Sequence, residues 1–510
     1  MDELQALFPN LYLGFDTALS PKNLMYCFIG VLAGTMIGVL PGIGPLATIA
    51  MLLPITFNLE ATSALIMLAG IYYGCQYGGS TTAILVKLPG ESASVVTCMD
   101  GHEMAKQGRA GPALAIAAIG SFIAGTIGTI LIARVGPPLA EMALKFGAPE
   151  YFSLMVMGLI ASAVLASSSM KKAIAMILLG LLIGIVGTDV NSGMSRFTFG
   201  ASGLMDGLSF TVVAMGLFGF AEILANLNKK QDASMRQLLT GKIEHLYPTR
   251  SDLRKSIGPI FRGTALGAFF GALPGAGPTI AAFSTYALEK KVAKHPEEFG
   301  KGAIQAVAGP ESANNAAAQC AFIPTLALGI PGSATMALML GALTIQGIAP
   351  GPQVMTQRPE LFWGLIASMW IGNAMLVILN LPLIGLWVRL LRVPYRLLFP
   401  AILTFMAIGV YSVNNLDLDV YMTVMFGLLG FVFLKLRLEP APLILAFVLG
   451  PLMEENLRRA LLISRGDFSV FFTRPISAGF LIATVVLLVV MILPNVRMRR
   501  DRALEESAQA

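Results

Sequence analysis

The stretch that decides the fold is Gly34-Thr-Met-Ile-Gly38-Val-Leu-Pro41-Gly42-Ile-Gly44-Pro45, which interrupts an apolar run. Proline removes a backbone donor and clashes with the preceding turn, so a continuous helix cannot pass through Pro41. The glycines and the second proline complete the break. In a membrane, the freed N–H and C=O groups must be satisfied by protein, water or ligand, and never by lipid. The sequence therefore predicts a broken helix here, with a new helix that begins near Pro45.

The composition places this stretch in a membrane protein. Only 13% of the 510 residues are charged, against roughly a quarter in soluble domains. Residues 110–133 and 475–496 contain no charge at all, and roughly 20 apolar residues suffice to span the hydrocarbon. We expect an all-α polytopic membrane protein with about 10–14 membrane segments. Nucleic-acid binding is excluded, because the sequence has no basic patch interleaved with aromatic residues.

The opening stretch has a second copy in the chain. Residues 267–278, which include Pro274, Gly275 and Gly277, match residues 34–45 at seven of twelve positions. Leu88-Pro89-Gly90 likewise corresponds to Ile330-Pro331-Gly332. We therefore expect two repeats. The expected division of the chain is an amphipathic N-terminal helix (1–22), a first transmembrane repeat (23–227), a cytoplasmic linker (228–256), a second transmembrane repeat (257–496) and a cytoplasmic tail (497–510).

The basic residues of short loops predict the orientation of the spans, since such loops face the cytoplasm. Residues 188–204 and 414–419 are poor in positive charge and are expected outside, whereas residues 454–475 mix both signs and give no clear side. The span at 112–134 then runs outward and its counterpart at 362–388 runs inward. The repeats would have inverted topology, which is typical of secondary transporters. The loops predicted to be cytoplasmic contain Lys106 and Arg109, Lys171 and Lys172, residues 228–256, residues 389–396, Lys435 and Arg437, and residues 497–502.

The broken, re-entrant helices predict the position of a substrate site. A helix that begins after a break presents free N–H groups and a positive dipole end, which suit a carboxylate. A helix that ends before the break presents carbonyls, which suit Na⁺ or a proton donor. Half-helices in matching positions of two repeats predict that the substrate binds between them. The alternative is a kink that only permits close helix packing, to which Gly34 and Gly38 are also suited. The backbone candidates for the substrate site are Pro41, Gly42, Gly44, Pro274, Gly275 and Gly277.

Two polar stretches, 72–82 and 309–315, enter nearly uncharged surroundings. Buried polar groups are costly unless they find partners, so these side chains are candidate ligands. The alternative is hydrogen bonding between helices. Glu311, with Ser312 and Asn314, is the candidate for a coupling proton or Na⁺, or else a helix N-cap. Lys87 either meets a substrate carboxylate or extends to the membrane interface. The side-chain candidates for substrate binding are Tyr77, Gly79, Ser80, Thr81, Thr82, Lys87, Asn314, Asn315 and Ser333.

Other chemistries have little support in the sequence. The four cysteines are far apart and predict buried free thiols, and the three histidines are expected in polar loops without metal-ligand spacing. No GxxxxGK[ST] loop is present, so an ion gradient is the expected energy source. No cofactor is expected beyond Na⁺ as a coupling ion. An intramembrane enzyme on a lipid-linked substrate would need a nucleophile and base within the membrane. A channel or structural subunit would not need the paired broken helices.

These motifs together resemble the large membrane subunit of the tripartite tricarboxylate transporters, the TctA family. They are the Leu-Pro-Gly-x-Gly-Pro motif, residues 77–82, residues 309–315 and Gly329-Ile-Pro-Gly-Ser333. The resemblance implies a small four-helix membrane subunit and a periplasmic solute-binding protein as partners. It also implies cation-coupled import of citrate or other carboxylates across the bacterial inner membrane. Lys87 departs from the pattern, since a neutral residue is expected before this Pro-Gly.

Overall fold

The computed structural model describes residues 2–40, 43–165, 169–189, 192–227, 246–273, 277–390 and 395–492. These residues form helices joined by short loops, together with one antiparallel hairpin of two short strands, β1 (Gly187–Thr188) and β2 (Ser195–Arg196). The helices before residue 228 are α1 (Asp2–Leu19), α2 (Pro21–Gly38), α3 (Pro45–Leu52), η1 (Leu53–Thr56), α4 (Ala61–Val86), η2 (Ser92–Ser94), α5 (Val95–Lys106), α6 (Ala110–Ala143), α7 (Ala148–Leu165), α8 (Met170–Gly184), η3 (Ser202–Leu204), α9 (Phe210–Ala214), η4 (Met215–Phe220) and α10 (Ala221–Asn226).

The second half of the chain repeats this kind of organisation. Its first helix begins at Arg250, inside the stretch expected as a linker. Thr249 caps that helix through a reciprocal pair of hydrogen bonds with Asp252. The helices of this half are α12 (Arg250–Ala272), α13 (Gly277–Val292), η5 (Pro296–Glu298), α14 (Gln305–Cys320), α15 (Phe322–Leu328), α16 (Ala334–Ile345), α17 (Gln353–Gln357), α18 (Pro359–Asn380), α19 (Ile384–Leu390), α20 (Tyr395–Asn414), α21 (Asp417–Lys435), α22 (Ala441–Ile463), α23 (Val470–Thr473) and α24 (Pro475–Ile492).

The predicted interruptions of the helices are confirmed. Helix α2 ends at Gly38 and α3 begins at Pro45, while α12 ends at Ala272 and α13 begins at Gly277. Helices α4 and α15 end just before the two later Pro-Gly pairs. Pro41, Gly42, Pro274 and Gly275 themselves lie outside the described residues.

The two halves share one packing pattern, in which a row of glycines lies against a helix backbone. A Cβ atom on Gly34 of α2 would lie 2.3 Å from the carbonyl oxygen of Ile71 in α4. A Cβ atom on Gly267 of α12 would lie 2.4 Å from the carbonyl oxygen of Ala313 in α14. The flanking glycines, four residues away on either side, make the same kind of contact in both halves. Only glycine permits this approach, so the glycines of both motifs are needed for the close contact of the helices.

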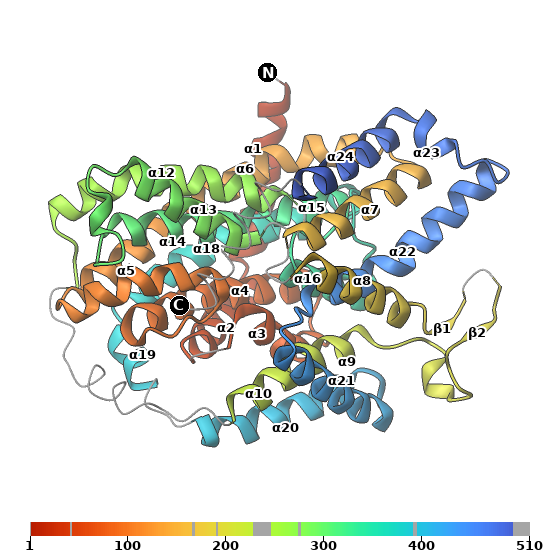
Figure 1. Ribbon diagram of the computed structural model, residues 1–510, viewed down its shortest axis with the longest axis horizontal. Helices are drawn as coiled ribbons and strands as arrows, with labels where there is room; N and C mark the ends of the chain where they lie inside the picture. The colour runs from red at the N-terminus through yellow and green to blue at the C-terminus, as the bar shows by residue number, and fades with distance from the viewer. Residues whose placement is uncertain are drawn as a thin grey trace.

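Each half also packs one long helix against the other half. Helix α6 of the first half packs on α12 and α14, and α18 of the second half packs on α2 and α4. In Figure 1, α14 lies beside α4 and α5 and is covered by α12 and α13, while α7, α8, α22 and α24 form the other end of the molecule. Helix α1 packs on α18, with Leu7 and Leu11 against the core and with Phe8 and Tyr12 exposed.

Three helices of the described part, α6, α18 and α21, are both long and apolar enough to cross a membrane. Several shorter apolar helices accompany them. One predicted segment differs from the structure. The expected span 362–388 is divided at residues 381–383, where Pro382 ends α18. The first part of the charged stretch 454–475 is helical, since α22 runs to Ile463 and Glu454 and Arg458 pair one turn apart on it.

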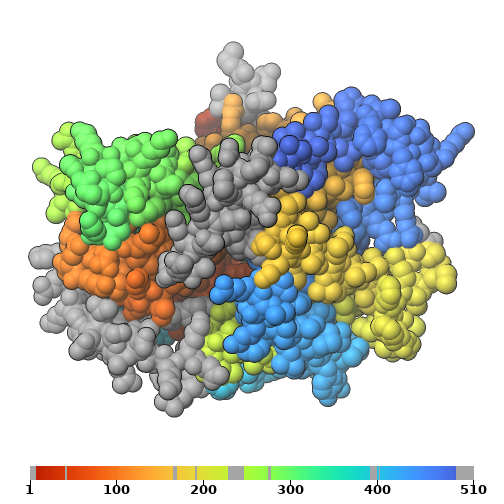
Figure 2. Space-filling view, in the orientation of Figure 1, coloured from red at the N-terminus to blue at the C-terminus, as the bar shows by residue number. Residues whose placement is uncertain are grey.

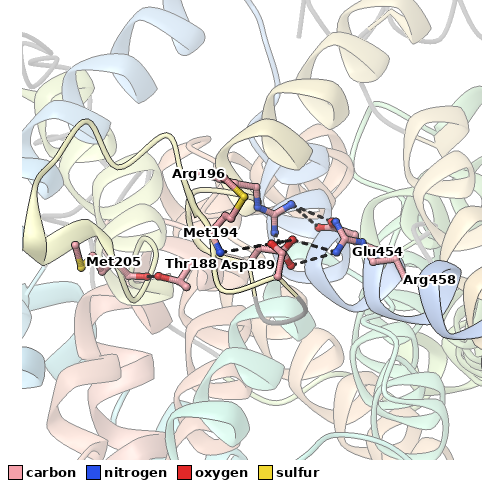
Figure 3. Close-up of polar contacts among 8 residues, drawn as sticks. Thr188, Asp189, Met194, Arg196, Met205, Glu454 and Arg458 are labelled. Carbon is pink, nitrogen blue, oxygen red and sulfur yellow. Dashed lines mark hydrogen bonds and ion pairs between the residues drawn. The ribbon is translucent and has the colours of Figure 1, made fainter. Parts of the chain in front are cut away.

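An ion-pair network fastens the β-hairpin to the second half of α22. Figure 3 shows Asp189 and Glu454 between the guanidinium groups of Arg196 and Arg458. Arg196 Nη1 donates to Glu454 Oε1 at 2.9 Å, and Arg458 Nη1 donates to Asp189 Oδ2 at 3.1 Å. Figure 2 shows these segments, yellow and blue, side by side at one end of the molecule. Residues 454–458 therefore lie on the same side as the hairpin.

We expect Glu454→Ala to loosen the hairpin. The change removes an acceptor from both arginines, and a partly exposed network of this kind contributes about 1 kcal/mol. Limited proteolysis of the purified protein should therefore cut residues 192–204 roughly threefold to tenfold faster. Glu455→Ala is the matched control, because Glu455 pairs only locally with Arg459 on the exposed face of α22. Equal cleavage of the two variants would show that the network does not hold the hairpin.

Candidate functional site

The Glu311 carboxylate is held by hydroxyl groups from two other helices. Glu311 lies on α14 and is 2% exposed. Ser80 of α4 donates its hydroxyl to Glu311 Oε2 at 2.6 Å, and Thr97 of α5 donates to Oε1. Ser80 and Thr97 belong to the first half of the chain and Glu311 to the second. The carboxylate therefore joins the two halves at a point where α4, α5 and α14 meet. We call this group of three residues the Glu311 centre.

The Glu311 centre opens onto a small cavity. The hydroxyl of Tyr77 and the amide oxygen of Asn380 line this cavity, and neither atom has a hydrogen-bond partner within the described residues. The cavity can therefore supply both a donor and acceptors to a bound group. Its lining consists of Tyr77, Ser80, Thr81, Leu114, Ala117, Ala118, Ser121, Glu311, Asn380, Leu381 and Ile384.

A second group of contacts forms around the loop after α4. A Cβ atom on Gly90 would lie 2.4 Å from Cα of Gly79, so the loop touches the backbone of α4. Gly44, the first residue before α3, lies against the carbonyl of Gly90. Glu91 Oε1 accepts a hydrogen bond from Asn314 Nδ2 at 2.7 Å. We call Gly44, Gly79, Gly90, Glu91 and Asn314 the Pro-Gly junction.

The junction also contacts the second broken helix. The hydroxyls of Ser92 and Thr279 are hydrogen-bonded at 2.7 Å. Thr279 lies in the first turn of α13, and Gly277 begins that helix with φ +63°, a conformation that favours glycine. The structure therefore brings the starts of α3 and α13 to the same loop, residues 90–92.

The residues predicted separately for substrate and for the coupling cation lie together. Tyr77, Ser80 and Thr81 share one cavity with Glu311, and Asn314 reaches the junction next to it. Several of the predicted hydroxyls instead bond within their own helix. Thr81, Thr82 and Ser312 donate to the carbonyls of Tyr77, Gly79 and Ala308, at 3.2, 2.8 and 2.7 Å respectively.

Lys87 and Ser333 occupy helix ends. Lys87 follows α4 in a left-handed conformation, with φ 56°, and its side chain is exposed. Ser333 precedes α16, and its hydroxyl accepts the N–H of Met336 as an N-cap. Asn315 lies deeper, with its amide oxygen unpartnered within the described residues.

The sequence analysis missed three polar residues, namely the hydroxyl of Thr97 and the carboxylates of Glu91 and Asp100. Thr97 was overlooked because residues 95–98 look like an ordinary half-apolar segment. Glu91 directly follows a Pro-Gly pair, and a charge at that place in an apolar region was the available signal. Asp100 is fully buried and accepts the N–H groups of Gly302 and Ala303 at 2.9 and 2.8 Å, so it locks α5 to the second half.

The cysteine and histidine predictions have different outcomes. All four cysteines are free and buried, as predicted. His295 is exposed, but His102 is 4% exposed within α5, where Nδ1 lies 3.1 Å from the carbonyl of Ile84. The polar-loop prediction was therefore wrong for His102, because α5 turns its polar face into the protein. His245 lies outside the described residues. Within the described ranges, no cluster of three His, Cys, Asp or Glu side chains could hold a metal ion.

Comparison with known proteins places the chain in a family. The model of the tripartite tricarboxylate transporter TctA family matches residues 24–445. An uncharacterised 52.8 kDa protein from the TAR-I ttuC′ 3′ region of Agrobacterium vitis is 58% identical over 500 residues, which cover 98% of this chain and 99% of that protein. An uncharacterised protein from the TAR-II ttuC′ 3′ region of the same organism is 58% identical over 240 residues, which cover 47% of this chain and 99% of that protein. No solved structure matches the chain. The match over most of the sequence, on a helical protein with several apolar spans, shows that the chain is a multi-pass membrane protein of the tripartite tricarboxylate transporter TctA family.

Proposed function

We propose that this chain is the large permease subunit of a cation-coupled, binding-protein-dependent secondary transporter in the bacterial inner membrane. Its proposed substrates are tricarboxylates or related carboxylates, and its proposed partners are a small four-helix subunit and a periplasmic solute-binding protein. Membership of a tripartite transporter family supports the permease role and the existence of partner subunits. The observation that carries the proposal is the Glu311 centre, which joins both halves of the chain beside a cavity.

The Glu311 centre suits a coupling cation. A carboxylate buried this deeply is costly as a bare anion, so it takes up a proton or binds a cation. The hydroxyls of Ser80 and Thr97 satisfy its two oxygens with neutral groups and leave its charge uncompensated. A bound Na⁺ or proton would supply that compensation. Because the ligands come from both halves, the cation's occupancy would depend on how the halves are arranged.

The Pro-Gly junction suits the carboxylate substrate. The N-termini of α3 and α13 meet the same loop, and helix N-termini favour anions. The equivalent glycine packing of α2 on α4 and of α12 on α14 supports two related repeats. Inverted repeats with broken helices bind their substrates at the repeat interface in many transporters. Gly44 and Gly277 would then offer backbone N–H groups, while Lys87 lies at the edge of this region.

Sidedness can be tested with single cysteines, since the four native thiols are buried and should react little. We expect Phe199→Cys and Ile463→Cys to react with an impermeant maleimide from outside the cell. Both residues are exposed, and the ion-pair network joins their segments. Arg437→Cys should react only after permeabilisation, because Arg437 lies beside Lys172 in a loop predicted to be cytoplasmic. Labelling of position 463 solely from inside would contradict this arrangement.

Reconstitution tests the transport function itself. Proteoliposomes that contain this chain and the small subunit should accumulate labelled citrate against its gradient. They should do so only when the binding protein and an inward Na⁺ or proton gradient are both present. Uptake that does not need the binding protein would contradict the tripartite proposal. Uptake that merely equilibrates, with no gradient required, would indicate a channel.

A further inference from the structure

Buried amide oxygens that have no hydrogen-bond partner among the described residues gather where α6, α14 and α18 meet. On α14, Ser312, Asn315 and Gln319 follow one another at helical spacing on one face, toward α6. On α6 this face meets Gly125 and Gly128, and a Cβ atom on Gly128 would lie 2.9 Å from Cβ of Gln319. The helices are close enough that only small residues fit between them. We call Asn315, Gln319 and Asn373 of α18 the amide seam.

Two amide oxygens of the seam point to the same place. Asn315 Oδ1 lies 3.1 Å, and Asn373 Oδ1 and Nδ2 each lie 3.0 Å, from the position that a Cβ on Gly125 would take. Asn373 Nδ2 donates to the carbonyl of Met369 at 2.9 Å, which fixes the amide and leaves its oxygen as the free atom. The side chains are almost fully enclosed, since Asn315 is 2% exposed and Asn373 and Gln319 are 0% exposed.

These oxygens need a ligand. Asn315 Oδ1, Asn373 Oδ1 and both polar atoms of Gln319 have no hydrogen-bond partner among the described residues. A buried acceptor without a partner is costly, and several together in an apolar protein interior are rare. Amide oxygens carry partial negative charge, so they bind a hydrogen-bond donor or a cation. Rings of neutral oxygens replace the hydration shell of monovalent cations in channels.

The chemistry of the seam favours a single positive charge. Hard cations take oxygen ligands, and divalent ions are normally bound with carboxylates that offset their charge. The seam's own ligands are neutral amides, which suit an ion of one charge. Asn315 also lies one turn after Glu311 on α14, so an ion in the seam would be next to the Glu311 centre but separate from it.

We propose that Asn315 and Asn373, with Gln319, bind one sodium ion in the amide seam. The assignment rests on the proposed function in one respect, because a sodium ion bound there would be a coupling ion. Binding itself needs neither substrate, nor partner subunits, nor a gradient. It can therefore be measured on the purified full-length chain in detergent, by binding of radioactive ²²Na⁺ and by thermal unfolding in NaCl against choline chloride at equal ionic strength.

The test compares two asparagines that make the same kind of hydrogen bond within a helix. Asn373→Leu removes the seam oxygen and keeps the same branched arrangement of heavy atoms. Asn456→Leu on α22 is the matched control, because Asn456 also donates to the carbonyl one turn earlier but lies in neither the amide seam nor the Glu311 cavity. We expect saturable Na⁺ binding by the wild-type protein, at least tenfold weaker binding by Asn373→Leu, and a change of less than twofold in Asn456→Leu. The Na⁺-dependent rise in Tm should follow the same order.

Four outcomes would overturn the assignment. They are no saturable binding to the wild type, unchanged binding in Asn373→Leu, a larger loss in Asn456→Leu, and equal binding of K⁺. If Asn373→Leu does not fold, the test uses Asn373→Asp instead. This change keeps an oxygen and adds a negative charge, so the variant should bind Na⁺ more tightly than the wild type. Coupled uptake without Na⁺ binding at the seam would overturn this inference and leave the proposed function intact. Na⁺ binding without uptake would do the reverse.

Discussion

Glu311→Gln is expected to abolish concentrative uptake while the protein remains folded and at least as stable as the wild type. Glutamine has nearly the same shape, and the hydroxyls of Ser80 and Thr97 can each accept as well as donate hydrogen bonds. The change therefore keeps the packing of α4, α5 and α14 and removes the charge. Burial of a neutral amide costs less than burial of a carboxylate, so Tm should not fall.

The loss of transport should be large. Each hydrogen bond to a charged group contributes about 1.5–3 kcal/mol. Glutamine keeps the hydrogen bonds but loses the charge that holds the cation, and a loss of roughly 3 kcal/mol in cation binding corresponds to at least about hundredfold in initial uptake rate. The measurement is uptake of labelled citrate by the reconstituted complex under a cation gradient. Tm should be recorded on the same preparations.

Two further variants separate the charge from the geometry. Glu311→Asp keeps the charge but shortens the side chain by one methylene, so it should retain partial uptake. Ser80→Ala removes one of the two donors and should cost roughly tenfold. If Glu311→Gln still accumulates substrate against a gradient, the Glu311 centre is not where the coupling cation binds.

The parts of the fold that were predictable depend on local chemistry. The Leu-Pro-Gly-x-Gly-Pro motif combines two prolines with two glycines, so the interruptions before Pro45 and Gly277 followed from a few adjacent letters. Single glycine-proline pairs do not break α14 or α22, where Pro310 and Pro451 lie inside the helix. The long apolar runs likewise predicted α6 and α18, although Pro382 divides the expected span 362–388. The extension of α22 to Ile463 was missed, because charged residues look like a loop until their pairing along the helix is considered.

The candidate site was only partly predictable, because its contacts join residues far apart in the chain. Ser80 and Glu311 were both identified, but as members of separate sets, since the hydrogen bond between them spans 231 positions. Glu91 and its partner Asn314 are 223 positions apart. Polarity in an apolar region showed which residues need partners. The tertiary packing of the two halves decides which partners they obtain.

Gly90→Ala is expected to disable the protein, whereas the chemically identical change Gly79→Ala should be far milder. The two glycines touch each other, but their contacts are not equivalent. A Cβ on Gly90 would lie 2.4 Å from Cα of Gly79, a separation that no side-chain movement can relieve. A Cβ on Gly79 would lie 3.4 Å from Cα of Gly90, which is ordinary contact. The loop of the Pro-Gly junction must therefore move away from α4 in Gly90→Ala and can stay in place in Gly79→Ala.

Displacement of this loop would disturb two contacts between the halves of the chain at once. Its next residue, Glu91, pairs with Asn314, and Ser92 meets Thr279 at the start of α13. Overpacking of this kind costs about 1–3 kcal/mol, and more where backbone faces backbone. We expect Gly90→Ala to lower uptake by more than about tenfold and to reduce the yield of folded protein. Gly479→Ala on α24 is the control for added volume, because a Cβ there would meet nothing within 4 Å. Equal uptake by the Gly90→Ala and Gly79→Ala variants would show that the close contact between loop and helix is not needed, and the junction would then lose its place as the proposed carboxylate site.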